Sequence, residues 1–125
     1  MICKTTKGVK VSIKTAYKGI FDSDSHVFSY KVILENKSEY CVKLLRRHWI
    51  IKDLGDFDDH IKGDGVIGKQ PYINPGETFI YESGAKLKST IGSMKGNYVF
   101  KRMEDNQLFN VEIPEFKLIA PQIYN

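Results

Sequence analysis

The stretch KGDGVIGKQP, residues 62–71, decides the fold, because it contains a possible phosphate-binding motif. Three glycines in it have the spacing G-x-G-x-x-G: Gly63, Gly65 and Gly68. In a mononucleotide-binding fold this motif follows a strand and opens a helix, and the helix N-terminus faces a pyrophosphate. Pro71 and Pro75 come soon after the motif here, and they forbid a regular helix. The sequence therefore excludes a Rossmann-type nucleotide site, since no helix dipole can face the phosphates.

Two other interpretations of the glycine motif stay open. Consecutive backbone N–H groups in a glycine-rich turn can bind an anion without a helix, with charge added by Lys62 or Lys69. The candidate anion loop then consists of Gly63, Gly65, Gly68 and Lys69. The structural alternative is that the glycines permit tight bends or positive φ where a loop crosses from one sheet to the other. We favour this alternative, because short glycine patterns often match by chance.

The segments before the motif predict three strands. Apolar and polar residues alternate from Val9 to Tyr17 and again from Val27 to Glu35, which is typical of strands with one buried face. The polar segment FDSDSH, residues 21–26, predicts a turn between them. Residues Cys41–Lys52 carry bulky side chains on both faces, so we expect this third strand at the centre of its sheet. Trp49 lies on it and is expected to fill the space between two sheets.

The glycine motif lies in a segment with few periodic positions. From Asp53 to Asn74 the sequence is rich in Gly and Asp, and we expect a long loop with short strand-like pieces around His60–Lys62. Residues Thr78–Ser83 predict the next strand, after the turn formed by Asn74, Pro75 and Gly76. A turn at Ser83 and Gly84 is expected to end that strand.

The C-terminal part predicts a hairpin at a sheet edge. Residues Gly96–Arg102 and Gln107–Ile113 flank the turn EDN, and Pro114 is expected to break or bulge the last strand. About seven short strands without a helical pattern between them predict an all-β fold, an antiparallel two-sheet β-sandwich. A length of 125 residues indicates a single domain over residues 1–125.

Composition indicates an ordinary globular protein, with 42% hydrophobic and 27% charged residues. The formal charge of +4 is spread along the chain rather than gathered among exposed aromatic residues, which argues against a nucleic-acid partner. We see no targeting signal and no apolar run long enough to cross a membrane, so we expect a cytoplasmic protein without a membrane partner. In a reducing compartment Cys3 and Cys41 are expected to be free thiols.

Arg47 shares strand parity with Leu45, Trp49 and Ile51, while Arg46 and His48 have the opposite parity. We expect the aliphatic part of Arg47 to cover the core while its guanidinium reaches an edge or a partner carboxylate. The same alternation assigns Lys43 to the face of Arg47, so the basic residues of this strand are divided between its two faces.

One loop gathers possible metal ligands: Asp53, Asp56, Asp58, Asp59 and His60. Hard cations such as Mg²⁺ accept several carboxylate oxygens, but the order does not match an EF-hand, so we favour a solvated acidic turn over a Mg²⁺ or Co²⁺ site. His26, His48 and His60 lie on different expected elements and lack the spacing of a zinc site. No G-x-S-x-G or C-x-x-C motif occurs, so nucleophilic catalysis has no support, and we expect no cofactor.

The sequence around the glycine motif strongly resembles the bacterial ApaG family, and the resemblance runs from about Val9 to Leu118. Five segments carry it: RRHWIIKD (46–53), GDGVIGKQP (63–71), INPGE (73–77), FIYESG (79–84) and GSMKGNYVF (92–100). The resemblance implies a fibronectin type III or immunoglobulin-like sandwich. It also implies a binding rather than a catalytic role, because related domains occur in F-box proteins, where they look like substrate-recruiting modules, and in a polymerase-delta interacting protein.

The resemblance implies two further associations. Bacterial members of the family are associated with cobalt and magnesium resistance or efflux, and this chain could take part only indirectly, since it has no segment that could form a conduit. The family's pairing with a diadenosine tetraphosphate hydrolase raises the hypothesis of a pyrophosphate-containing nucleotide at Gly63–Lys69. Our first expectation is a noncatalytic module that binds another protein. Nucleotide binding by the glycine loop and divalent-metal binding by the acidic loop are the alternatives.

Overall fold

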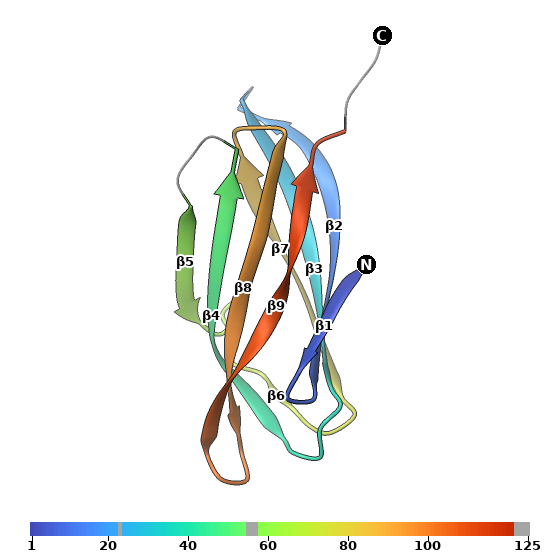
Figure 1. Cartoon of the computed structure of the whole chain (residues 1–125), viewed down its shortest axis with the longest axis vertical. Coiled ribbons are helices and arrows are strands. Elements are labelled where there is room, and N and C mark those ends of the chain that lie inside the picture. Colours follow the sequence, from blue (N-terminus) through green and yellow to red (C-terminus); the bar gives the residue numbers. More distant parts are fainter. Residues whose placement is uncertain (23, 55–57, 122–125) are drawn as a thin grey trace.

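The computed structural model describes residues 1–22, 24–54 and 58–121, and within these ranges it forms two antiparallel sheets packed face to face (Figure 1). The first sheet has the strand order β1-β2-β3-β7 and contains β1 (Ile2–Thr6), β2 (Val9–Phe21), β3 (Ser25–Asn36) and β7 (Thr78–Leu87). The second has the order β5-β4-β8-β9 and contains β5 (Asp59–Asp64), β4 (Val42–Asp53), β8 (Ile91–Arg102) and β9 (Gln107–Ile119). The short strand β6 (Tyr72–Ile73) also pairs with β4. The predicted all-β antiparallel sandwich is confirmed.

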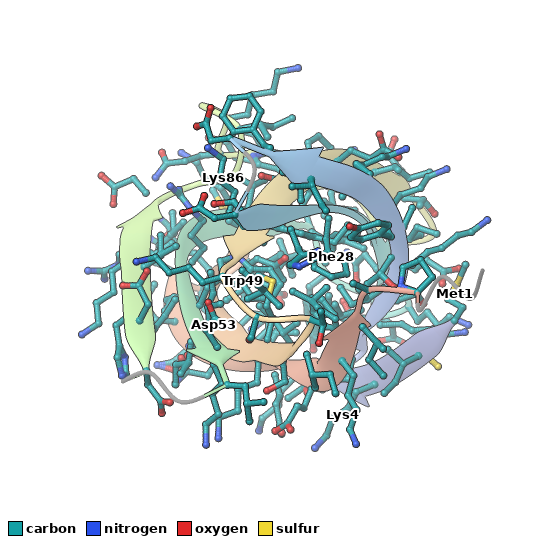
Figure 2. All side chains as sticks on the ribbon, turned by 90° about the horizontal axis from the view of Figure 1, so that it is seen from above. Met1, Lys4, Phe28, Trp49, Asp53 and Lys86 are labelled. Atoms are coloured by element: carbon teal, nitrogen blue, oxygen red, sulfur yellow. The ribbon has the colours of Figure 1, made fainter. Side chains whose placement is uncertain are left out.

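An aromatic core joins the two sheets. Trp49 of β4 is only 2% exposed, and its ring lies 5.2 Å from that of Tyr30 on β3 and 5.9 Å from that of Phe116 on β9, measured between ring centroids. Figure 2 shows Trp49 and Phe28 in the space between the sheets, with Lys4 and Lys86 at the periphery. Trp49 therefore fills the core, as expected, and β4 lies inside its sheet between β5 and β8.

A β-bulge at Leu45 changes which residues of β4 face the core. The pairing of β4 with β8 shifts between Leu44 and Arg46, so one extra residue is inserted on β4. Before the bulge Leu44 is buried, and after it the residues with the opposite parity, Arg47 and Trp49, face the other sheet. The prediction that Lys43 and Arg47 share a face is therefore wrong, because a bulge reverses the alternation of side chains.

One boundary prediction, that of the turn at Gly84, needs correction. The turn expected at Ser83 and Gly84 is absent, because β7 continues to Leu87 and Gly84 pairs with Ser29 of β3. Pairing along β3 here overrides the local turn preference of serine and glycine. Within the segment from Asp53 to Asn74, the strand-like pieces expected around His60–Lys62 form one strand, β5, which pairs with β4 at the sheet edge.

The two ends of the chain add strands at the edges. β1 was not expected from the sequence, and it joins β2 through a two-residue turn in which Lys7 and Gly8 have φ of 51° and 83°. The last strand continues past Pro114, where its pairing with β8 shifts, so the expected bulge is confirmed. Both Cys3 and Cys41 are free thiols. Among the described residues there is no helix of a length and hydropathy suited to spanning a bilayer.

Candidate functional site

The bulge of β4 anchors the glycine-rich loop. At Leu45 the extra residue leaves a carbonyl oxygen that is free to bind the loop. The N–H of Gly65 donates to this oxygen at 2.8 Å, and the side-chain amide of Gln70 donates to it at 3.0 Å. The N–H of Leu44 donates to the carbonyl of Pro71 at 3.0 Å. The loop is thus attached to β4 at both of its ends.

The middle of the loop is a tight hairpin turn. Val66 and Lys69 exchange two backbone hydrogen bonds, of 2.8 and 2.9 Å, and the two residues between them, Ile67 and Gly68, have φ of 45° and 76°. Two central residues with positive φ define a type I′ turn. Gly65 also has a positive φ, 61°, and a Cβ at this position would overlap the carbonyl oxygen of Lys69. These two glycines therefore allow backbone conformations that other residues adopt at a cost.

Gly63 has a different role, because it leaves room for the side chain of Arg47. Gly63 pairs with Arg47 across β5 and β4, and a Cβ on Gly63 would lie 2.8–2.9 Å from three atoms of the guanidinium. Nη1 of Arg47 donates to the carbonyl oxygens of Asp64 and Gly65, both at 2.9 Å. We expected Arg47 to reach an edge or a carboxylate; it reaches edge strand β5, and its acceptors are backbone carbonyls.

On the side that faces Arg47, the candidate anion loop offers hydrogen-bond acceptors, the carbonyl oxygens of Asp64 and Gly65. Two of its N–H groups, those of Gly65 and Lys69, already donate to backbone carbonyls, as does the N–H of the intervening Val66. Gly68 and Lys69 are exposed, Gly63 is half-buried and Gly65 is buried. The residues of the loop lie together, as the sequence indicated. Its backbone is hydrogen-bonded to Arg47 and to the backbone of β4.

Behind the turn, a hydroxyl pair lies between the sheets. The hydroxyl groups of Tyr81 on β7 and Tyr98 on β8 are hydrogen-bonded to each other. Burial raises the pKa of both phenols well above the ordinary value. The positive charge of Arg47 lowers the pKa of each, but burial outweighs it.

On the opposite face of β4, side chains of β4, β5 and β8 form a groove of about 430 Å³. We call it the basic groove and define it by its lining residues: Arg46, Arg47, His48, Lys62, Gly63, Asp64, Asn97 and Val99. His48 also contacts His60 of β5, with 3.0 Å between Nε2 of His48 and Nδ1 of His60. Burial, and then the charges of Lys62 and His60, lower the pKa of His48 below 6.5.

The histidine pair is a feature that sequence spacing did not reveal. His48 and His60 are twelve positions apart, and they meet because β5 folds back along β4. Short-range metal motifs cannot detect such a pair, but an assignment of the pairing between β4 and β5 would have found it.

The acidic loop does not assemble a metal centre in the described residues. The carboxylate of Asp53 accepts hydrogen bonds from the backbone N–H groups of Lys88 and Ser89, at 2.7 and 3.1 Å, and from the Ser89 hydroxyl. Asp58 lies 4.0 Å from Lys52. Within residues 1–22, 24–54 and 58–121 no three histidine, cysteine or carboxylate side chains are placed to hold a metal ion, and Asp56 falls outside these ranges.

Comparison with known proteins gives consistent matches. The sequence model described as the ApaG domain matches residues 21–102. Protein ApaG of Thiobacillus denitrificans is 40% identical over 118 residues, which is 92% of each chain. The X-ray structure of a structural genomics target has a TM-score of 0.89 at 33% identity and covers 98% of this chain and 94% of its own. The crystal structure of the putative ApaA protein from Bordetella pertussis has a TM-score of 0.85 at 36% identity, covering 92% and 95%.

Proposed function

Since this chain belongs to the ApaG family and folds as an all-β sandwich, we propose that it is a noncatalytic binding module that recognises another protein. The observation that carries the proposal is the basic groove, which lies on the outer face of the second sheet. Sheet faces with clustered charge recognise partners of opposite charge, because complementary potentials speed association and exclude wrong partners. An acidic segment of a protein is therefore the expected ligand.

The composition of the groove favours binding over catalysis. Arg46 and Lys62 supply permanent positive charge, and Asn97 supplies an amide that can both donate and accept hydrogen bonds. The lining has one carboxylate, Asp64, and no hydroxyl or thiol that could act as a nucleophile. Charged side chains without a hydroxyl or thiol beside them are suited to hold an acidic chain by ion pairs and hydrogen bonds.

A pyrophosphate-containing nucleotide is the second candidate ligand, because Lys62 of the groove directly precedes the glycine loop. The phosphates would then bind Lys62 and lie beside the loop of Gly63, Gly65, Gly68 and Lys69. The N–H groups of Gly65, Val66 and Lys69 would not take part, because they already donate to backbone carbonyls. Backbone amide shifts centred on Gly63–Lys69 during titration with diadenosine polyphosphate would favour this candidate. Shifts centred on Arg46 and Asn97 during titration with a glutamate-rich peptide favour our first proposal.

The family's association with cobalt and magnesium resistance or efflux stays a prediction, as do the cytoplasmic location and the fibronectin type III or immunoglobulin-like assignment. We propose that any effect on metal resistance runs through a protein partner. This can be tested by deleting the gene and measuring whether groove variants restore metal resistance. If a variant that no longer binds its partner restores resistance, the effect does not depend on partner binding in the groove.

Charge reversal in the groove tests the proposed function. We expect Arg46→Glu and Lys62→Glu each to reduce retention of a protein partner on immobilised protein by about tenfold or more. The matched control is Lys14→Glu, since Lys14 lies on the outer face of the first sheet and is exposed. Partners retained equally by the groove variants and by the control would show that the groove is not the binding surface.

A further inference from the structure

A cavity between the two sheets adds a second candidate site, which shares Arg47 with the basic groove. It has a volume of about 190 Å³ and lies behind the type I′ turn. Side chains from three strands and the turn line it, including Tyr30, Arg47, Trp49, Ile67, Tyr81 and Ser83. We propose that this inter-sheet cavity binds a small organic carboxylate with a flat apolar body.

The charge of the cavity favours an anion. Arg47 is its cation, and neither aspartate nor glutamate is among its lining residues. Within the described residues, no carboxylate lies within ion-pair distance of Arg47. Its hydrogen-bond acceptors, the carbonyls of Asp64 and Gly65, both bind Nη1, and within the described part of the chain no acceptor pairs with Nε or Nη2. Guanidinium donors match the geometry of a carboxylate, and the glycine loop holds them in place.

The walls of the cavity select the body of the ligand. Tyr30, Trp49 and Tyr81 are 6%, 2% and 5% exposed, and their rings form one part of the cavity wall beside the polar groups of Arg47 and Ser83. Flat apolar groups gain from burial against such rings. A phosphate dianion would need more donors than one guanidinium and the hydroxyl of Ser83 can provide, because burying unpaired charge is costly. A monoanion with a planar ring therefore fits the lining better than inorganic phosphate.

The turn at the rim of the cavity contains a strained backbone conformation at Ile67. Ile67 has φ of 45°, a conformation that is a genuine outlier for a β-branched residue, and its side chain is 52% exposed at the rim of the cavity. Neither burial of Ile67 nor its backbone conformation explains why isoleucine stands there. Backbone strain of this kind concentrates at ligand sites, where it is offset by the surrounding structure.

The sole tryptophan gives a direct readout, because Trp49 lines the cavity and the chain contains one Trp. We expect sodium benzoate to change Trp49 emission with a saturable dependence on concentration, and neutral benzamide to do so at least tenfold more weakly. Sodium phosphate at equal ionic strength should leave the emission unchanged. A response to phosphate that is tighter than the response to benzoate would overturn the assignment to a carboxylate.

Neighbouring arginines on opposite faces of β4 provide matched variants. Arg47→Met should weaken benzoate binding about tenfold or more, which is the scale of one charged hydrogen-bonded contact, whereas Arg46→Met should bind like the original chain. If Arg47→Met does not fold, benzoate binding by Ser83→Leu tests the proposal instead. The leucine side chain should fill the cavity and weaken benzoate binding while Arg47 is kept. Benzoate binding that is unaffected by Arg47→Met or by Ser83→Leu, or that is absent up to about 100 mM, overturns the proposal.

Discussion

The guanidinium of Arg47 occupies the space that a side chain on Gly63 would need, with Nη2 2.8 Å from the position of a Cβ. This relationship explains why the glycine motif is present although no helix follows it. Each glycine meets a local structural requirement. Gly63 leaves space for the guanidinium of Arg47, and Gly65 and Gly68 adopt positive φ. The motif thus fixes an arginine at the boundary between the inter-sheet cavity and the basic groove.

The two glycines with positive φ should respond differently to alanine. We expect Gly65→Ala to destabilise the protein by about 3 kcal/mol or more, because its Cβ overlaps a backbone oxygen in addition to the strained φ. Gly68→Ala should cost only about 1 kcal/mol, since nothing lies within 4 Å of its Cβ. Urea unfolding of both variants measures the difference. Equal costs would mean that the turn rearranges around a side chain at Gly65.

The strain at Ile67 predicts a stabilising substitution. Asparagine tolerates positive φ and favours type I′ turns, so Ile67→Asn should raise the unfolding free energy by about 1 kcal/mol and the Tm by a few degrees. The control is Ile61→Asn on β5, where φ is not positive and no gain is expected. A lower Tm for Ile67→Asn would show that the Ile67 side chain stabilises the fold by more than its backbone conformation costs.

Asp53 should make stability depend on pH in the acidic range. Burial alone would raise its pKa, but hydrogen bonds from Ser89 and Lys88 outweigh burial and bring the pKa below its ordinary value. Because the folded pKa is below the unfolded one, this contribution is present above about pH 4 and is lost as pH falls through the folded pKa.

Asp53→Asn therefore should cost about 1–2 kcal/mol at pH 7, and this cost should shrink towards pH 2.5. Thermal unfolding of both proteins from pH 7 to pH 2.5 gives the comparison. A difference in Tm that stays constant over this range would rule out the carboxylate as its source.

Tyr81 and Tyr98 should limit stability at alkaline pH. Burial raises the pKa of both phenols, so the folded state favours their protonated forms. Their contribution is complete below the unfolded pKa of about 10 and is lost as pH rises above it. Removing one hydroxyl with Tyr98→Phe should cost about 1–3 kcal/mol, because Tyr81 loses its buried partner.

The double variant Tyr81→Phe with Tyr98→Phe should be less destabilised than Tyr98→Phe alone, since neither ring keeps an unpaired hydroxyl. It should also lose less stability between pH 9 and pH 11. Tyrosine absorbance at 295 nm and unfolding curves report both effects. Greater destabilisation of the double variant than of the single one would contradict the account of this pair.

The alternating patterns of the sequence were sufficient to predict the sandwich, the central position of β4 and the buried Trp49. They failed where tertiary pairing outweighs local preference. β7 continues through Ser83 and Gly84 because it pairs with β3, and the bulge at Leu45 reverses the parity of β4 without any proline or glycine to mark it.

The sequence predicted which residues form the glycine loop, but not which residues they contact. Gly63, Gly65 and Gly68 lie in one loop, as the motif indicated, but their partners come from β4, which is distant in sequence. The contact of Arg47 with Gly63 and that of His48 with His60 both depend on the register of β5 against β4, and no local pattern specifies that register.

A double-mutant cycle on Gly63 and Arg47 tests most directly whether the motif exists to hold this arginine. Gly63→Ala should cost about 1 kcal/mol in the original chain, because the guanidinium must leave its carbonyl acceptors. In an Arg47→Ala background the same change should be neutral or stabilising, since alanine is preferred over glycine within a strand. An equal cost in both backgrounds, within about 0.5 kcal/mol, would contradict the account.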